Sequence, residues 1–218
     1  MSDVVLISDP RIAAIPVSDN GDPLLDLRRH APFPIDTRLA DRAGDFAHVR
    51  EGVLARLLDA QRLLPRGTTL LIVEGYRSVA QQSAYFEEHA ARHRNEHPTW
   101  SDEQVRVATS EYVSPPEIAP HSAGAAVDLT LVTADGQELD MGTGVNEVNG
   151  GACYTASPVI GQEARENRKL LGDALGAVGL VNYPTEWWHW SFGDRYWAFA
   201  TGARQAVYGP VERTASDG

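Results

Sequence analysis

Two short stretches of the chain contain side chains of the kind that hold a catalytic metal ion. Residues 121–128 begin with His121 and end with Asp128, and residues 186–189 begin with Glu186 and end with His189. Zinc hydrolases usually bind the metal through three protein ligands and leave a fourth position to water, while a separate carboxylate handles protons. We therefore predict that His121, Asp128 and His189 bind one zinc ion. Glu186 is the expected proton carrier.

A strand is the element expected to present Asp128. The β-branched residues between positions 127 and 133 favour a strand over a helix. Neighbouring side chains in a strand point to opposite faces, so Asp128 lies opposite to its apolar neighbours. One face can then pack against a core while the other presents a carboxylate to a cleft. Gly124 interrupts the chain before this strand, which leaves His121 in a loop.

The stretch that contains Glu186 and His189 is expected to run from a turn into a strand. Pro184 favours a turn at Glu186, and the aromatic content of residues 187–192 is typical of a strand. Because a three-residue step changes face within a strand, the two side chains converge most easily with Glu186 on the turn and His189 on the strand. Most of the nearby tryptophans are expected in the core, and one or two as walls of the cleft.

These motifs and their order resemble the zinc D-alanyl-D-alanine dipeptidases of the vancomycin-resistance type, in peptidase family M15. The similarity rests on Gly-Tyr-Arg-Ser at 75–78, His-Ser-Ala-Gly-Ala-Ala-Val-Asp at 121–128 and Glu-Trp-Trp-His at 186–189. Similarity around these motifs extends the match over roughly residues 68–197. The resemblance implies an α+β fold, an antiparallel sheet flanked by helices as in zinc DD-peptidases and hedgehog-like proteins.

The resemblance also implies a role for each matching residue. His121, Asp128 and His189 would bind one Zn²⁺ per chain. Glu186 would act first as general base and then as general acid, and Arg77 would stabilise the oxyanion of the tetrahedral intermediate. The alternative for Arg77 is a surface arginine in a salt bridge. The implied substrate is a small peptide.

Two positions depart from the family pattern where the substrate's amino group is expected. The family has a serine two residues before the first histidine ligand, where this chain has Ala119, and an aspartate beyond Met-Gly, where it has Asn146. A methyl group and a neutral amide cannot supply the same charge-assisted hydrogen bonds to a free ammonium as the serine and aspartate of the family. Glu147 lies next door, and a shift of one residue in this loop would restore the charge. The other candidate substrate-binding residues are Glu74, Tyr76 and Trp188.

Three functions remain open at this stage. The first is zinc-dependent hydrolysis of the amide bond in D-Ala-D-Ala or a related small peptide that contains D-amino acids. The second is a carboxypeptidase or amidase of the same fold that acts on an N-acylated peptidoglycan fragment or natural-product intermediate. The third is a zinc-binding module without turnover. Glu186 and Arg77 together weigh against the third, because a structural zinc needs neither a base nor an oxyanion clamp.

A second group of histidines and a lone cysteine offer rival sites. His89, His93 and His97 stand four residues apart, so a continuous helix would align them on one side. Imidazole suits zinc, nickel and copper. The charged neighbours and Pro98 instead favour a solvated surface that binds metal only adventitiously. Cys153 has no evident base partner and is interpreted as structural.

Composition limits the classes of protein and partner. The 218 residues are enough for one core and short for two, so we expect a single domain over residues 1–218 in which residues 1–45 wrap the remainder. The net charge of −11 argues against a nucleic-acid partner, and no run of about 18 apolar residues suggests a membrane span. One cysteine and a start without signal-peptide features predict a cytoplasmic protein. A homo-oligomer is left open.

Hydrophobic periodicity gives the expected order of helices and strands. Helices are predicted over residues 46–64, 79–95, 101–110 and 162–178, and strands over residues 68–73, 125–131 and 187–192. A hairpin-type turn is predicted at 134–136, and a glycine-rich loop over 142–151 is expected to form a wall of the cleft.

Overall fold

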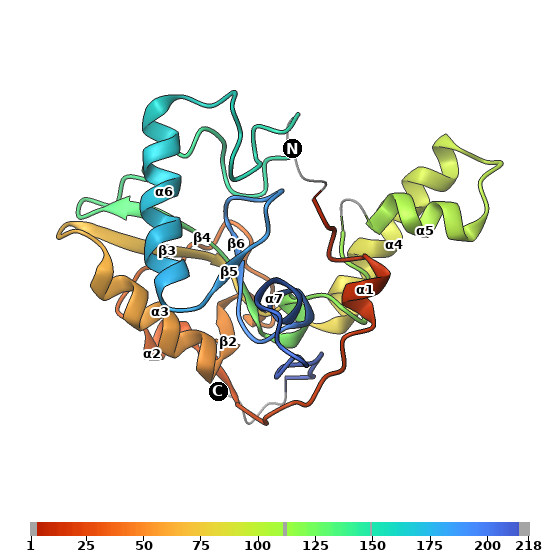
Figure 1. Ribbon diagram of the computed structural model, residues 1–218, viewed down its shortest axis with the longest axis horizontal. Helices are drawn as coiled ribbons and strands as arrows, with labels where there is room; N and C mark the ends of the chain where they lie inside the picture. Colours follow the sequence, from red (N-terminus) through yellow and green to blue (C-terminus); the bar gives the residue numbers. More distant parts are fainter. Residues whose placement is uncertain (1–3, 111–112, 149, 214–218) are drawn as a thin grey trace.

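A four-stranded antiparallel sheet forms the centre of the molecule. The computed structural model describes residues 4–110, 113–148 and 150–213. The strand order is β3-β4-β6-β5, where β3 is Thr68–Glu74, β4 is Ala126–Thr133, β5 is Val181–Asn182 and β6 is His189–Ser191. Helices α3 (Glu51–Leu63) and α6 (Gln162–Ala177) pack against each other beside this sheet (Figure 1). The predicted α+β class, with helices flanking an antiparallel sheet, is confirmed.

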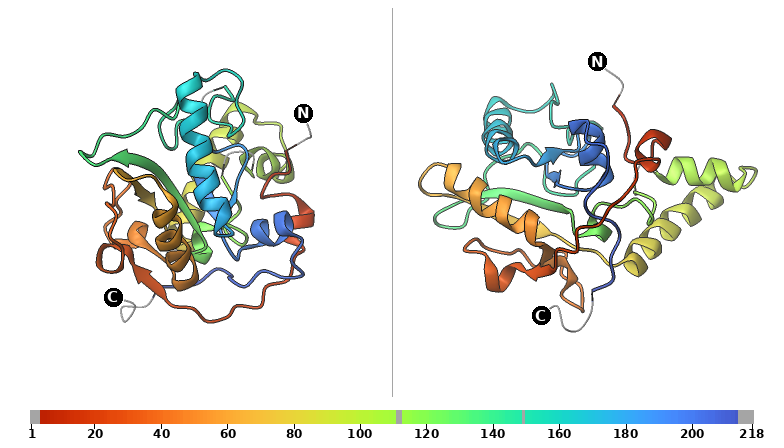
Figure 2. Two further views of the ribbon diagram at one scale, coloured as in Figure 1. Left: turned by 60° about the vertical axis from the view of Figure 1, so that its left-hand side comes forward. Right: turned by 60° about the horizontal axis from the view of Figure 1, so that its bottom comes forward.

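Shorter elements surround this core. They are α1 (Pro10–Ala13), β1 (Leu24–Asp26), α2 (Leu27–His30), the 3₁₀ turn η1 (Asp45–Ala47), β2 (His48–Arg50), α4 (Val79–Glu96), α5 (Asp102–Ser110), the 3₁₀ turn η2 (His121–Ala123) and α7 (Arg195–Thr201). Helices α4 and α5 pack together and project away from the sheet, on the side opposite to α3 and α6 (Figure 2).

The alternation of side chains along β4 explains why its two faces differ. Val127, Leu129 and Leu131 are fully buried in the main hydrophobic core, which they share with apolar residues of α3 and α6. Burying such side chains contributes roughly 1.5–3 kcal/mol each. The opposite face holds Asp128 and Thr130, which are also buried. The core therefore fixes the strand that presents the carboxylate.

Two sequence predictions about element boundaries were wrong, and one helix was missed. Helix α3 begins at Glu51 and not at residue 46, because His48–Arg50 pair with β1 as strand β2. The predicted strand over 187–192 is reduced to β6, and Trp187 and Trp188 belong to the preceding turn. Helix α7 was not predicted. Its N-cap is Asp194, whose side chain accepts hydrogen bonds from two backbone N–H groups of the first turn.

The N-terminal segment follows the outside of the molecule. Its described part, residues 4–45, contains α1, β1 and α2. Val17 lies beside Ala206, and the backbone N–H of Ser18 donates to the Ala206 carbonyl at 2.9 Å, so this segment runs along the C-terminal region. Residues 1–3 lie outside the described part. Among the described helices, none has the length and apolar character needed to cross a membrane.

The register of the sheet aligns three polar residues at one end. Glu74 of β3 pairs with Asp128 of β4, and Asp128 pairs in turn with His189 of β6. An irregularity in the pairing between Ile72 and Glu74 precedes this row. The row brings residues from three strands, separated by more than a hundred positions in sequence, to the same edge of the sheet.

Candidate metal centre and active site

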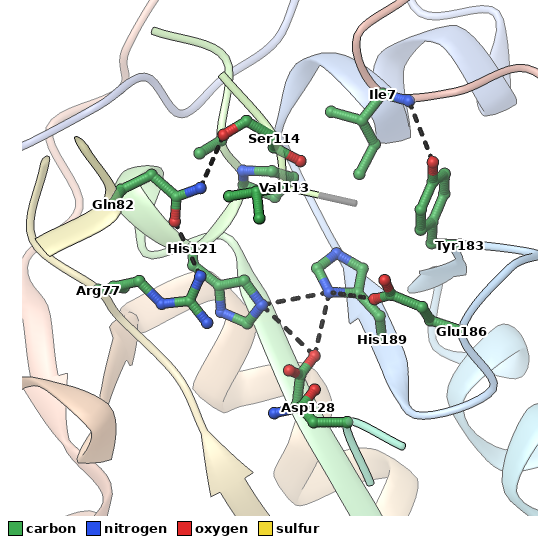
Figure 3. Close-up of a pocket in the computed structure, with 13 residues that line it drawn as sticks. Ile7, Arg77, Gln82, Val113, Ser114, His121, Asp128, Tyr183, Glu186 and His189 are labelled. Carbon is green, nitrogen blue, oxygen red and sulfur yellow. Dashed lines mark hydrogen bonds and ion pairs between the residues drawn. The ribbon is translucent and has the colours of Figure 1, made fainter. Parts of the chain in front are cut away.

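Three predicted ligands lie together in a buried pocket. His189 Nδ1 is 3.0 Å from Asp128 Oδ1, His121 Nε2 is 3.4 Å from the same oxygen, and the two ring nitrogens are 3.2 Å apart. All three residues are less than 10% exposed. The close-up in Figure 3 shows the two imidazoles and the carboxylate directed toward one another. Among the described residues, this is the one cluster of histidine, cysteine or acidic side chains with metal-site spacing.

The spacing of the three donor atoms fits a tetrahedral zinc ion. Bonds of about 2.0–2.1 Å to nitrogen and oxygen place neighbouring ligand atoms about 3.3–3.4 Å apart in a tetrahedron. The observed separations of 3.0, 3.2 and 3.4 Å are close to this edge length. Two imidazoles and a carboxylate also match the donor set of catalytic zinc sites. Three ligands leave a fourth position for water or substrate.

Backbone contacts and charge prepare the ligands for a cation. His121 Nδ1 donates to the Gly75 carbonyl at 2.6 Å, which leaves Nε2 free to bind the metal and fixes the orientation of the ring. Burial opposes ionisation of Asp128, yet the neighbouring His121 and His189 outweigh it and hold the pKa of this carboxyl well below its usual range. The carboxylate is therefore anionic, as a metal ligand must be.

Glu186 lies beside the ligands without joining them. It occupies the turn that follows Pro184, and its Oε2 is 3.9 Å from His189 Nδ1. Burial raises the pKa of Glu186, against the opposing effect of His189. A raised carboxyl pKa suits a group that takes up and returns a proton near neutral pH.

Arg77 reaches the pocket from the segment that follows β3. Its Nε and Nη2 donate to the two oxygens of Glu74 at 2.8 and 2.5 Å, and its Nη1 donates to Gln82 at 2.9 Å. Because a guanidinium has five N–H groups, two remain to donate elsewhere. The Glu74 carboxylate raises the pKa of Arg77 although burial opposes this. Arg77 is thus a partly buried cation held in place by Glu74 and Gln82, and not a surface arginine.

The structure places the predicted substrate-binding residues in two groups. Ala119 and Asn146 line the pocket. Glu74, Tyr76 and Trp188 do not: Glu74 binds Arg77, the Tyr76 hydroxyl donates to the Val211 carbonyl at 2.8 Å, and Trp188 is 1% exposed. The last three therefore do not line the pocket.

Several pocket residues carried no sequence signal, among them Ile7, Gln82 and Tyr183. Ile7 comes from the N-terminal segment, and its backbone N–H donates to the Tyr183 hydroxyl at 3.4 Å (Figure 3). Gln82, in the first turns of α4, accepts from Arg77 and donates to the Ser114 carbonyl at 2.7 Å. None of these residue types marks a site by itself, so only their position in the fold identifies them.

The rival sites differ in structure from the pocket. His97 ends helix α4 as its C-cap and stacks on Trp100 with ring centroids 3.8 Å apart, and His93 stacks on the same ring at 6.1 Å. The three histidines do not form a cluster with metal-site spacing. Cys153 is buried and unpaired, and its carbonyl accepts from the Trp187 backbone N–H at 3.0 Å.

Comparison with protein families and curated proteins identifies relatives of this chain. The family model described as D-ala-D-ala dipeptidase, in peptidase family M15, matches residues 47–205. A D-alanyl-D-alanine dipeptidase of Synechocystis sp. is 30% identical over an alignment of 239 positions. The alignment covers 91% of this chain and 96% of that protein. The D-alanyl-D-alanine dipeptidase of Escherichia coli is 39% identical over 69 residues, 32% of this chain and 35% of that protein.

Solved structures with a similar arrangement were also found. One is a vancomycin-resistance D,D-pentapeptidase in complex with Zn(II), at 16% identity and a TM-score of 0.41, covering 80% of this chain and 91% of that one. Another is an LD-carboxypeptidase, LdcB, at 16% identity and a TM-score of 0.49, covering 87% of this chain and 77% of that one.

Proposed function

Because the chain belongs to the D-alanyl-D-alanine dipeptidase family of peptidases, we propose that it hydrolyses the amide bond of a D-Ala-D-Ala unit at a zinc site. The observation that supports this proposal is the convergence of His121, Asp128 and His189 at tetrahedral spacing. These three residues would hold one zinc ion. When bound, zinc would polarise the substrate carbonyl and lower the pKa of water to about 7.

Glu186 moves the proton in the proposed reaction. Its carboxylate accepts a proton from the attacking water as the new C–O bond forms. The same carboxyl then gives the proton to the leaving amine as the C–N bond breaks. Its place beside His189, without a ligand position of its own, suits this exchange.

Arg77 stabilises the negative charge that develops on the carbonyl oxygen. Its two remaining N–H groups are available to that oxygen, and Glu74 and Gln82 prevent the side chain from turning away. Donors that are held in place before the reaction need no reorganisation when charge develops, which is the main source of such stabilisation.

A zinc-binding module without turnover is the weaker candidate. A structural zinc site is normally closed by four protein ligands, whereas this cluster has three and opens to a pocket with a carboxylate and a guanidinium. Neither Glu186 nor Arg77 would have a purpose in such a module.

Substitution of Glu186 by glutamine tests the proposal. We expect Glu186→Gln to lower kcat for D-Ala-D-Ala substrates by about 10²–10⁴-fold, the usual contribution of a general acid–base group. Zinc content, measured by elemental analysis, should be unchanged because Glu186 is not a ligand. Glu147→Gln is the matched control and should retain turnover. Undiminished hydrolysis by Glu186→Gln would exclude Glu186 as the base.

A further inference from the structure

The acidic side chains of the pocket all lie at the metal site. Asp128 and Glu186 are the carboxylates among the described residues that line it. Asp128 contacts both histidine ligands, and Glu186 lies 3.9 Å from His189. Both are therefore used by the metal and the proton transfer. A further cation that entered the pocket would find no uncommitted carboxylate among the described residues that line it.

Apart from Arg77, the described residues in the rest of the pocket wall are uncharged. Ile7, Val113 and Ala119 are apolar, and the Tyr183 hydroxyl accepts from the Ile7 backbone. The charge of the one guanidinium in the wall, Arg77, is already balanced by Glu74. Moving an ammonium group from water to such a wall would cost several kcal/mol unless a counter-charge replaced its hydration.

Asn146 is a polar side chain of the wall that is free to bind a ligand, as is the Ser114 hydroxyl. In the described part of the chain its amide makes no hydrogen bond, and its backbone adopts the left-handed conformation with φ 64°. Asparagine tolerates this conformation better than most residues. The adjacent Glu147 instead accepts from the Gly144 backbone N–H at 3.0 Å, within its own loop. The loop is therefore not shifted by one residue, and Glu147 does not take the place of Asn146 in the pocket wall.

We infer that the group on the amino side of the scissile D-Ala-D-Ala bond is a neutral amide and not a free ammonium. The inference rests on the proposed function and narrows its substrate class to N-acylated D-Ala-D-Ala, as at the end of a longer peptide. An acyl amide offers one N–H and one C=O, and the Asn146 side chain has both an acceptor and donors to match them. Water then cleaves the last amide bond and releases D-alanine and the acylated remainder.

Competition between two substrates tests this inference. We expect kcat/KM for N-acetyl-D-alanyl-D-alanine to exceed that for D-alanyl-D-alanine by about tenfold or more, since a charged hydrogen bond is missing for the free amine. Asn146→Asp places a carboxylate in the wall. It should change the ratio by about tenfold in favour of the free dipeptide.

Glu147→Gln is the matched control, because it removes a charge one residue away without entering the pocket. It should leave the ratio unchanged. A wild-type preference for the free dipeptide would overturn the inference and leave the proposed function intact. A ratio that Asn146→Asp does not move, or that Glu147→Gln moves equally, would overturn the assignment to Asn146. Failure to cleave either substrate would contradict the proposed function itself, and the inference with it.

Discussion

The metal centre and the loop that carries Asn146 are built in different ways. Two of the proposed metal ligands, Asp128 and His189, face each other across β4 and β6, so the hydrogen bonds of the sheet fix their separation. The loop, residues 141–154, contains neither helix nor strand in its described parts, 141–148 and 150–154. Side chains from elsewhere hold it in place. The position of the metal centre therefore depends on the pairing of strands β4 and β6. The position of the loop that carries Asn146 depends on a few side-chain contacts, which can change without loss of the fold.

Arg168 of α6 makes most of the contacts that hold this loop. Its guanidinium donates to the carbonyls of Met141, Ala152 and Tyr154 at 2.7–2.9 Å, so it joins the two ends of the loop. It also lies 5.4 Å from the ring centroid of Trp187, the residue after Glu186. One buried arginine thus positions the loop of Asn146 against the turn of Glu186, the proposed general base.

Loss of a metal ligand should have the largest effect. We expect Asp128→Asn to reduce bound zinc from one ion per chain to a small fraction and to lower kcat/KM roughly a thousandfold or more, because the anionic ligand is lost. Elemental analysis after dialysis and a turnover assay measure the two effects. His97→Ala is the control and should change neither. Full zinc content in Asp128→Asn would show that the ion binds elsewhere.

The clustering of the proposed metal-site side chains could be predicted from sequence because their residue types are chemically specific. His121, Asp128, Glu186 and His189 stand in two short motifs, and the β-branched residues near Asp128 indicated its strand. The predicted convergence of Glu186 from a turn and His189 from a strand matches their observed places. Local sequence determined these features, so local patterns were sufficient.

The position of the loop that carries Asn146 could not be predicted in the same way. Its contacts join residues that are far apart in sequence, and several of them involve backbone carbonyls. Arg168 lies in a polar helical stretch where arginine is normally exposed, yet it is 4% exposed and bonds to carbonyls, which leave no trace in sequence. Ile7 reaches the pocket from more than a hundred residues away. Strand β2 was interpreted as helix because its partner, β1, is distant in the chain.

Substitution of Arg168 should affect the loop that carries Asn146 and leave the metal centre unchanged. We expect Arg168→Ala to lower the free energy of unfolding by about 3 kcal/mol, because three carbonyls lose their donor and a buried side chain is lost. Loosening of the loop should raise KM roughly fivefold while zinc content stays at the wild-type value. Urea denaturation, steady-state kinetics and elemental analysis measure these effects.

Arg168→Lys keeps the charge and loses the planar fork that reaches three carbonyls. We expect it to recover only part of the lost stability and of the lost KM. An unchanged KM in both variants would mean that the loop holds its position without Arg168. A loss of zinc in either folded variant would show that the metal side depends on the loop, contrary to the comparison above.

The smallest expected effect comes from a single hydrogen bond between the loop and the turn. The Trp187 Nε1–H donates to Thr143 Oγ1 at 2.8 Å, and Thr143→Val replaces this hydroxyl with a methyl group of similar size. The indole N–H, in a side chain that is 2% exposed, then lacks an acceptor, which should cost about 1–2 kcal/mol of stability. Thr143→Ser keeps the acceptor and should cost less than Thr143→Val. If the two variants unfold at the same urea concentration, the hydrogen bond contributes nothing, and packing of Trp187 and Arg168 alone joins the loop to the turn of Glu186.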